Sequence, residues 1–151
     1  MQSTNEITIL GDPDALKPHV YKLAANIQEW PSILPHYRYV RVLEQSRRHK
    51  VAKFGARRGY FPVYWKARQN LYPETSRITF EHTGGITRGM QVEWRMQPCE
   101  GGLRVTIYHE LSYPIPVLGP LFARNVVGKY FVQHIADQTL QCFKQLLEGL
   151  H

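Results

Sequence analysis

The sequence predicts an α+β fold in which an antiparallel sheet packs against one long C-terminal helix. Residues 37–112 alternate apolar and polar side chains as β-strands do, whereas residues 121–147 repeat apolar side chains at helical spacing. The helical stripe consists of Phe131, Val132, Ile135, Ala136, Leu140, Cys142, Phe143, Leu146 and Leu147. A lone helix has to bury such a stripe, and the sheet is the available partner. We therefore expect the sheet and the helix to enclose a cavity.

The N-terminal region predicts one strand and two short helices. Residues 6–10 alternate isoleucine and threonine as a first strand does. Asp12 is placed to cap a helix that starts at Pro13, and its apolar residues up to Ile27 recur every three or four positions. A short second helical turn lies between Trp30 and Pro35, with Trp30 as a packing corner.

Six further strands follow, separated by glycine-containing or basic turns. They are predicted at Tyr37–Gln45, Val51–Arg57, Tyr60–Tyr72, Arg77–His82, Met90–Met96 and Leu103–Leu111. Pro62 lacks a backbone donor, so we expect it at an edge or a bulge. With the first strand, the predicted sheet has seven strands.

The period-two pattern gives each strand one apolar, aromatic face and one charged face, as expected for a sheet covered on one side. We expect the apolar face and the helix to supply the ligand-contacting residues. These candidates are Trp65, Phe80, His82, Met90, Trp94, Met96, Ile107 and His109 from the strands, and Phe131 and Ile135 from the helix.

His82 and His109 support two interpretations. A histidine titrates near neutral pH, so either residue is suited to general acid–base catalysis. A single histidine on an apolar face is, however, more often a hydrogen-bonded core residue or a ligand contact. We assign them to ligand contact and name no catalytic residue. No nucleophile triad, metal-ligand spacing or dinucleotide motif is present, so the sequence predicts neither a metal nor a cofactor.

The segment Tyr113–Pro120 contains three prolines and a glycine between the last strand and the helix. Such a segment cannot join either hydrogen-bond ladder. We expect Ile115, Val117 and Leu118 to act as a gate over the apolar opening; a rigid structural corner is the alternative.

Charge is concentrated in one part of the chain. Residues 38–68 contain ten lysines and arginines and a single acid, Glu44. This segment is suited to contact with an anionic membrane, ribosomal RNA or an acidic protein, or it is simply a solvated strand surface. The chain has only two cysteines, no apolar run of membrane-spanning length and no signal-peptide pattern. We expect a single domain over residues 1–151 in the cytoplasm.

Several stretches resemble a known family. They are Glu29–Tyr37 with Val40–Glu44, Gly89–Trp94, Val105–Glu110 and Ile135–Leu140. They are similar to the polyketide cyclase/dehydrase and coenzyme Q-binding group of the START-like, Bet v 1-like (SRPBCC) superfamily. The resemblance implies a helix-grip fold: a seven-stranded antiparallel sheet wrapped around the C-terminal helix, with two short N-terminal helices and a pocket. Members of the superfamily bind lipids, quinones, polyketides or hormones, some catalyse cyclisation or dehydration, and one branch acts on the ribosome.

We therefore expect non-covalent binding or transport of a hydrophobic small molecule, such as a quinone, a lipid or a polyketide-like aromatic. A non-enzymatic binding protein is favoured. The first alternative is a polyketide aromatase/cyclase or dehydrase, and the second is a macromolecule-binding protein that uses residues 38–68.

Overall fold

The computed structural model describes residues 2–85, 87–111 and 120–149, with the backbone alone for residues 58 and 120–132. Seven strands form one antiparallel sheet in the order β1-β7-β6-β5-β4-β3-β2. The strands are β1 (Gln2–Leu10), β2 (Tyr37–Gln45), β3 (His49–Arg58), β4 (Phe61–Tyr72), β5 (Arg77–Gly85), β6 (Met90–Cys99) and β7 (Gly102–Leu111). The helices are α1 (Pro13–Ala25), α2 (Trp30–Ile33) and α3 (Pro120–Glu148), with 3-10 turns η1 (Ile27–Glu29) and η2 (Pro73–Thr75).

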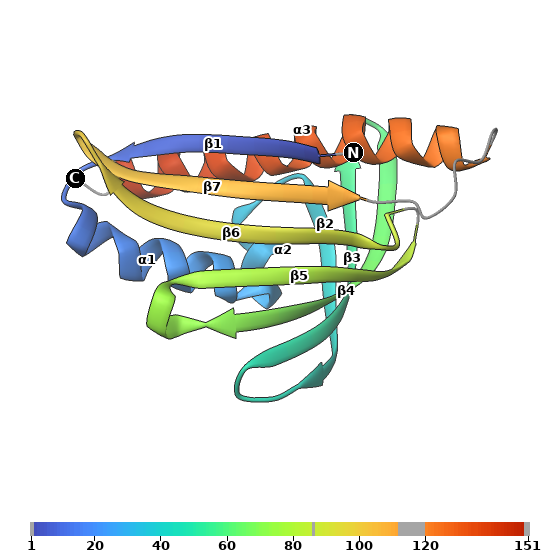
Figure 1. Ribbon diagram of the computed structural model, residues 1–151, viewed down its shortest axis with the longest axis horizontal. Coiled ribbons are helices and arrows are strands. Elements are labelled where there is room, and N and C mark those ends of the chain that lie inside the picture. The colour runs from blue at the N-terminus through green and yellow to red at the C-terminus, as the bar shows by residue number, and fades with distance from the viewer. Residues whose placement is uncertain (1, 86, 112–119, 150–151) are drawn as a thin grey trace.

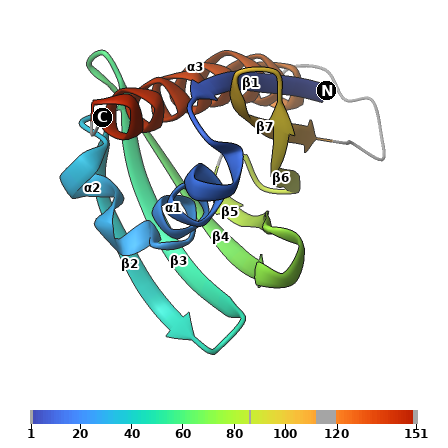
Figure 2. The same cartoon turned by 90° about the vertical axis from the view of Figure 1, so that its left-hand side faces the viewer.

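The sheet is strongly curved, and the helices fill its concave side. α3 runs alongside β1, while α1 and α2 carry the chain from one edge strand, β1, across to the other, β2 (Figures 1 and 2). Within the described residues, no helix is long and apolar enough to cross a membrane.

β1 is longer than the alternation predicted, because it begins at Gln2 rather than at Glu6. It pairs with β7 over its whole length, from Gln2 opposite Glu110 to Leu10 opposite Gly102. Asn5 also donates a hydrogen bond of 3.0 Å to the backbone carbonyl of Gln133 in α3. The polar start of β1 is therefore held by backbone pairing and by α3, neither of which leaves an apolar pattern.

The predicted buried stripe of α3 needs one correction. Ile135, Ala136, Leu140, Phe143 and Leu147 are buried, but the side chain of Leu146 is 40% exposed. Leu146 lies in the last turns of the helix. Helical periodicity predicts the direction in which a side chain points, but not how far along the helix the sheet and the other helices extend to cover it. Phe131 and Val132 lie outside the described side chains.

The end of α1 is held by two polar side chains from the sheet. Lys50 Nζ donates to the carbonyl oxygen of Ala25 and to Gln28 Oε1, at 3.0 and 3.1 Å. Gln69 Nε2 donates to the carbonyl oxygen of Ala25 at 3.2 Å. Lys50 therefore belongs to the protein interior, and the basic segment 38–68 presents one base fewer than its sequence indicates.

Candidate ligand cavity

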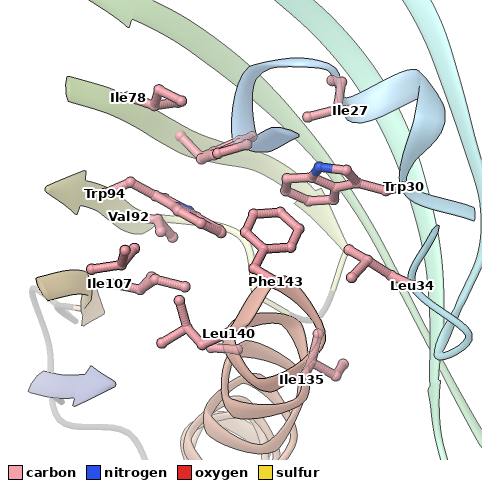
Figure 3. Packing of buried hydrophobic residues seen from close by; sticks show 14 of the residues in the cluster. Ile27, Trp30, Leu34, Ile78, Val92, Trp94, Ile107, Ile135, Leu140 and Phe143 are labelled. Atoms are coloured by element: carbon pink, nitrogen blue, oxygen red, sulfur yellow. The ribbon is translucent and has the colours of Figure 1, made fainter. Parts of the chain in front are cut away.

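A cavity of about 60 Å³ lies between the concave face of the sheet and α3. Its walls come from the N-terminal turn, the central strands and one side of α3. The described residues that line it are Trp30, Tyr37, Phe54, Trp65, Phe80, His82, Val92, Trp94, Ile107, His109, Ile135, Ala136 and Thr139. Figure 3 shows Trp30 and Trp94 on the two sides of this interior, with Ile135 approaching from α3.

Parallel rings form one wall of the cavity. The rings of Phe54 and Trp65 are stacked at 5.3 Å, and Trp65 is stacked in turn on His82 at 5.8 Å. Phe54 and Trp65 lie directly opposite each other on β3 and β4. The sheet register therefore builds this wall as a stack of aromatic rings from three neighbouring strands.

Trp30 joins the N-terminal turn to the cavity. Its Nε1 donates a hydrogen bond of 3.0 Å to the carbonyl oxygen of Leu23 in α1. Its ring lies 5.0–6.2 Å from the rings of Tyr37, Phe54 and Trp94. Trp30 is thus the packing corner that the sequence predicted, and it is also part of the cavity wall.

The two predicted histidines both line the cavity and are both buried. His82 Nδ1 is hydrogen-bonded to the hydroxyl of Thr87 at 2.6 Å. Burial, with a smaller contribution from His109, lowers the pKa of His82 to about 3. Burial lowers the pKa of His109 to about 4. Both rings are therefore uncharged at neutral pH.

His109 differs from His82 in one respect. Its Nδ1 is buried and has no hydrogen-bond partner among the described residues. An unpaired buried polar atom costs about 1–3 kcal/mol, so such atoms are rare in folded proteins. Of the described residues that line the cavity, His109 alone carries a buried side-chain nitrogen or oxygen without a partner.

A second polar group joins the helix to the N-terminal turn. Thr139 donates from its hydroxyl to the carbonyl oxygen of Ile135 at 2.8 Å, one turn earlier in α3. The same hydroxyl is hydrogen-bonded to His36 Nε2 at 2.9 Å and to the hydroxyl of Tyr37. Because the Thr139 proton is already used, His36 donates to this hydroxyl through Nε2–H.

Burial also sets the protonation of this second group. It lowers the pKa of His36 to about 4. Burial raises the pKa of Tyr37 above its ordinary value, and the hydrogen bond with Thr139 only partly opposes that rise. The polar lining of the cavity is consequently neutral throughout.

Seven predicted ligand residues line the cavity: Trp65, Phe80, His82, Trp94, Ile107, His109 and Ile135. Met90 and Met96 do not. They face the same side of β6 and are buried, but they lie opposite Leu111 and Val105, to either side of the Val92–Trp94 section that forms the wall. The side chain of Phe131 is not among those described, and the predicted gate, Ile115, Val117 and Leu118, lies outside the described residues.

Sequence reasoning missed six lining residues: Trp30, Tyr37, Phe54, Val92, Ala136 and Thr139. Phe54 and Val92 stand on inward-facing strand rows and were identifiable from the period-two pattern. Ala136 belongs to the predicted helical stripe, but neither it nor Thr139 indicates a pocket from the sequence, because small or hydroxylated residues on a helix occur in any packed interface. Among the described residues, no cluster of three histidines, cysteines or carboxylates is placed to hold a metal ion.

Comparison with solved structures places this architecture among known folds. A protein of Thermus thermophilus, TTHA0849, superimposes with a TM-score of 0.77 at 19% identity, over 99% of both chains. The Zhui aromatase/cyclase from a Streptomyces species superimposes with a TM-score of 0.69 at 18% identity, over 97% of this chain and 96% of the other. At these identities the likeness concerns the fold, which is the START-like helix-grip arrangement predicted from the sequence.

Sequence comparison gives a more specific relationship. The chain is 28% identical over 95 residues to the actinorhodin polyketide synthase bifunctional cyclase/dehydratase of Streptomyces coelicolor. That match covers 62% of this chain and 30% of the curated relative, so the chain spans about a third of the relative's length. Residues 15–139 match the family described as polyketide cyclase/dehydrase and lipid transport. The chain belongs to this polyketide cyclase/dehydrase and lipid transport family, as the sequence motifs predicted.

Proposed function

We propose that this protein binds a hydrophobic small molecule non-covalently in the cavity between the sheet and α3. The ligand class is an apolar or aromatic compound with at least one polar oxygen, such as a quinone, a lipid with a hydroxyl or carbonyl group, or a polyketide-like aromatic. The observation that carries the proposal is an aromatic cavity whose lining includes two buried, uncharged imidazoles, His82 and His109. Nδ1 of His109 has no partner among the described residues, so a ligand oxygen that reached it as the walls separate would satisfy a buried polar atom while the carbon skeleton contacts aromatic rings.

The neutral state of the lining supports an apolar ligand over a charged one. A charged headgroup in this cavity would lose its hydration without gaining an ionic partner, which is costly. His82 and His109 stay uncharged at neutral pH because their pKa values are about 3 and about 4. Each buried methylene of a ligand contributes roughly 0.8 kcal/mol, before the cost of ordering the ligand.

The size of the cavity adds a requirement. Its volume of about 60 Å³ suits a few water molecules. Small-molecule sites usually measure roughly 300–1,000 Å³. Binding of the proposed ligands therefore requires the walls to separate, and we infer that α3 and the Trp30 turn move apart from the sheet as a ligand enters.

A polyketide cyclase or dehydratase is the second candidate function. The similarity to the bifunctional cyclase/dehydratase supports it, and so do two histidines inside one cavity. A general base works best when its pKa lies near the working pH. The pKa values of His82 and His109, about 3 and about 4, lie well below neutrality, which makes both residues weak proton acceptors. We therefore favour binding without turnover.

Displacement of a fluorescent probe tests the proposal. The protein should take up an uncharged fluorescent probe such as Nile red, and menadione should compete with the probe. Trp94→Ala and His109→Phe should each weaken menadione binding by about tenfold, the effect of losing one good contact. Met96→Leu is the matched control, because Met96 is buried on the same strand but does not line the cavity. Native folding without any probe uptake would contradict the proposal.

A further inference from the structure

The tip of the β3–β4 hairpin projects from the sheet. β2 pairs with β3 only as far as Tyr37 opposite Ala56, and β5 pairs with β4 only from Trp65 opposite Gly85. Residues 58–62 therefore form a two-stranded ribbon beyond both neighbouring strands, and Tyr64 lies at its base, where β2 still pairs with β3. In Figure 2 this ribbon, the green loop at the upper left, extends past α3.

Aromatic side chains cover the projecting ribbon. Tyr60, in the turn, is fully exposed, and Phe61 and Tyr64 are 68% and 49% exposed. A single exposed aromatic residue needs no explanation, but exposed apolar groups that gather in one place mark interaction sites. Three of them within five consecutive residues of one projecting hairpin form such a group.

Basic side chains stand directly behind the ribbon. Arg41, Lys53 and Lys66 lie opposite one another on β2, β3 and β4, on the outer face of the sheet. Like charges in opposing positions destabilise a sheet. None of the ion pairs between described residues involves these three bases. The hairpin itself contains no acid, and the acid that pairs across from it, Glu81 on β5, lies opposite Arg68, so the outer face around Arg41, Lys53 and Lys66 carries a net positive charge.

Two further aromatic rings, those of Tyr39 and Tyr64, lie between the hairpin tip and the three bases. Gly55 lies opposite both Tyr39 and Tyr64 in the register of β2, β3 and β4. A Cβ atom at position 55 would overlap the ring of Tyr39, so glycine is what lets this ring lie over β3. Tyr39 stacks on Tyr64 at 6.3 Å, and the guanidinium of Arg41 lies 5.0 Å from the Tyr39 ring.

We propose that this hairpin docks on an anionic membrane surface, with Tyr60 and Phe61 entering the interface and Arg41, Lys53 and Lys66 contacting lipid headgroups. Aromatic residues favour the membrane–water interface, and each nearby base adds attraction to anionic lipid. Single-stranded nucleic acid is the other polyanion that aromatic and basic surfaces recognise, but its bases stack on rings arrayed over a sheet face. Here the most exposed rings project from a ribbon end, which favours insertion over stacking.

Sedimentation with vesicles tests this proposal. The protein should bind vesicles made of equal parts phosphatidylcholine and phosphatidylglycerol, but not vesicles of phosphatidylcholine alone. Tyr60→Ser combined with Phe61→Ser should weaken binding about tenfold. Arg41→Gln combined with Lys53→Gln and Lys66→Gln should weaken it about a hundredfold, because each base near an anionic surface contributes about 1 kcal/mol. Binding should fall at about 1 M salt, where the Debye length shrinks to about 3 Å.

Leu10→Ser combined with Leu43→Ser is the matched control, because it removes two exposed apolar side chains that lie outside the hairpin. This control should bind vesicles as the unaltered protein does. The Tyr60→Ser, Phe61→Ser variant should still take up an apolar probe delivered in solution, since neither Tyr60 nor Phe61 lines the cavity. The proposal is overturned if the unaltered protein ignores anionic vesicles, if the tip variant binds them equally well, or if a fluorescent oligouridine binds the protein and vesicles do not.

Discussion

Lys50 and Ala25 are joined by a hydrogen bond of 3.0 Å between a buried ammonium group and the last carbonyl of α1. Gln28 supplies a second acceptor for this ammonium through its amide oxygen, and no ion pair between described residues involves Lys50. A helix C-terminus carries partial negative charge, so it stabilises a cation placed there. The sheet thereby fixes the end of α1, and with it the turn that carries Trp30 to the cavity.

Replacement of Lys50 by methionine should lower the free energy of unfolding by about 1–3 kcal/mol, because hydrogen bonds made by a charged group are lost and their acceptors stay buried. Urea denaturation measures the change. Lys53→Met, at an exposed position on the same strand, should stay within about 0.5 kcal/mol of the unaltered protein. Equal effects at positions 50 and 53 would show that Lys50 has no special role at the helix end.

Three buried histidines predict a loss of stability in mild acid. The pKa values of His36, His82 and His109 are lowered to about 4, 3 and 4, whereas an unfolded histidine titrates near 6.5. Between those values the unfolded chain binds more protons than the folded one, so stability falls as the pH decreases from about 6.5 towards 4. Each unit of pKa difference corresponds to about 1.4 kcal/mol, so the combined loss should reach several kcal/mol.

Urea denaturation at a series of pH values between neutrality and pH 4 checks this slope. His109→Gln should flatten part of it, because one of the three groups no longer titrates. His19→Gln, on the exposed surface of α1, should leave the slope unaltered. If the urea midpoint stays constant across this pH range, the pKa values of these histidines do not differ between the folded and the unfolded protein, and the prediction is wrong.

Removal of the Thr139 hydroxyl should destabilise the protein through lost hydrogen bonds. Thr139→Val keeps the shape of the side chain but removes the hydroxyl that is hydrogen-bonded to His36 and Tyr37. Leaving buried polar groups unpaired should lower the free energy of unfolding by about 1–3 kcal/mol. Thr139→Ser keeps the hydroxyl and should retain more stability than valine, although it loses a methyl group. If serine proves less stable than valine, packing rather than hydrogen bonding accounts for this position.

Much of the fold could be predicted from the sequence, because apolar and polar residues alternate regularly along the strands. Alternation placed Trp65, Phe80 and Trp94 on the inner face, where the structure has them facing the cavity. Pro62 lies, as expected, where β4 pairs only with β3. These features depend on the local period of the chain, which the sequence displays directly.

The polar part of the site depends instead on long-range contacts. His36 and Thr139 are 103 residues apart in the sequence, and their hydrogen bond exists only because the N-terminal turn packs on α3. In the sequence, Lys50 is indistinguishable from the surface bases around it. It is buried because the end of α1 packs against it. Periodicity describes which way a side chain points from its own element, but not which element arrives opposite it.

Ala136 offers the sharpest test of the cavity. This residue lies on α3 and lines the cavity, so valine there extends into existing space. Ala136→Val should therefore keep the free energy of unfolding within about 1 kcal/mol of the unaltered protein, while weakening menadione binding by about tenfold. Ala67→Val is the matched control, because Ala67 is buried without lining the cavity and overpacking there should cost about 1–3 kcal/mol. Denaturation and probe displacement on both variants separate the two effects. Unimpaired menadione binding by a folded Ala136→Val protein would place the ligand elsewhere than between the sheet and α3.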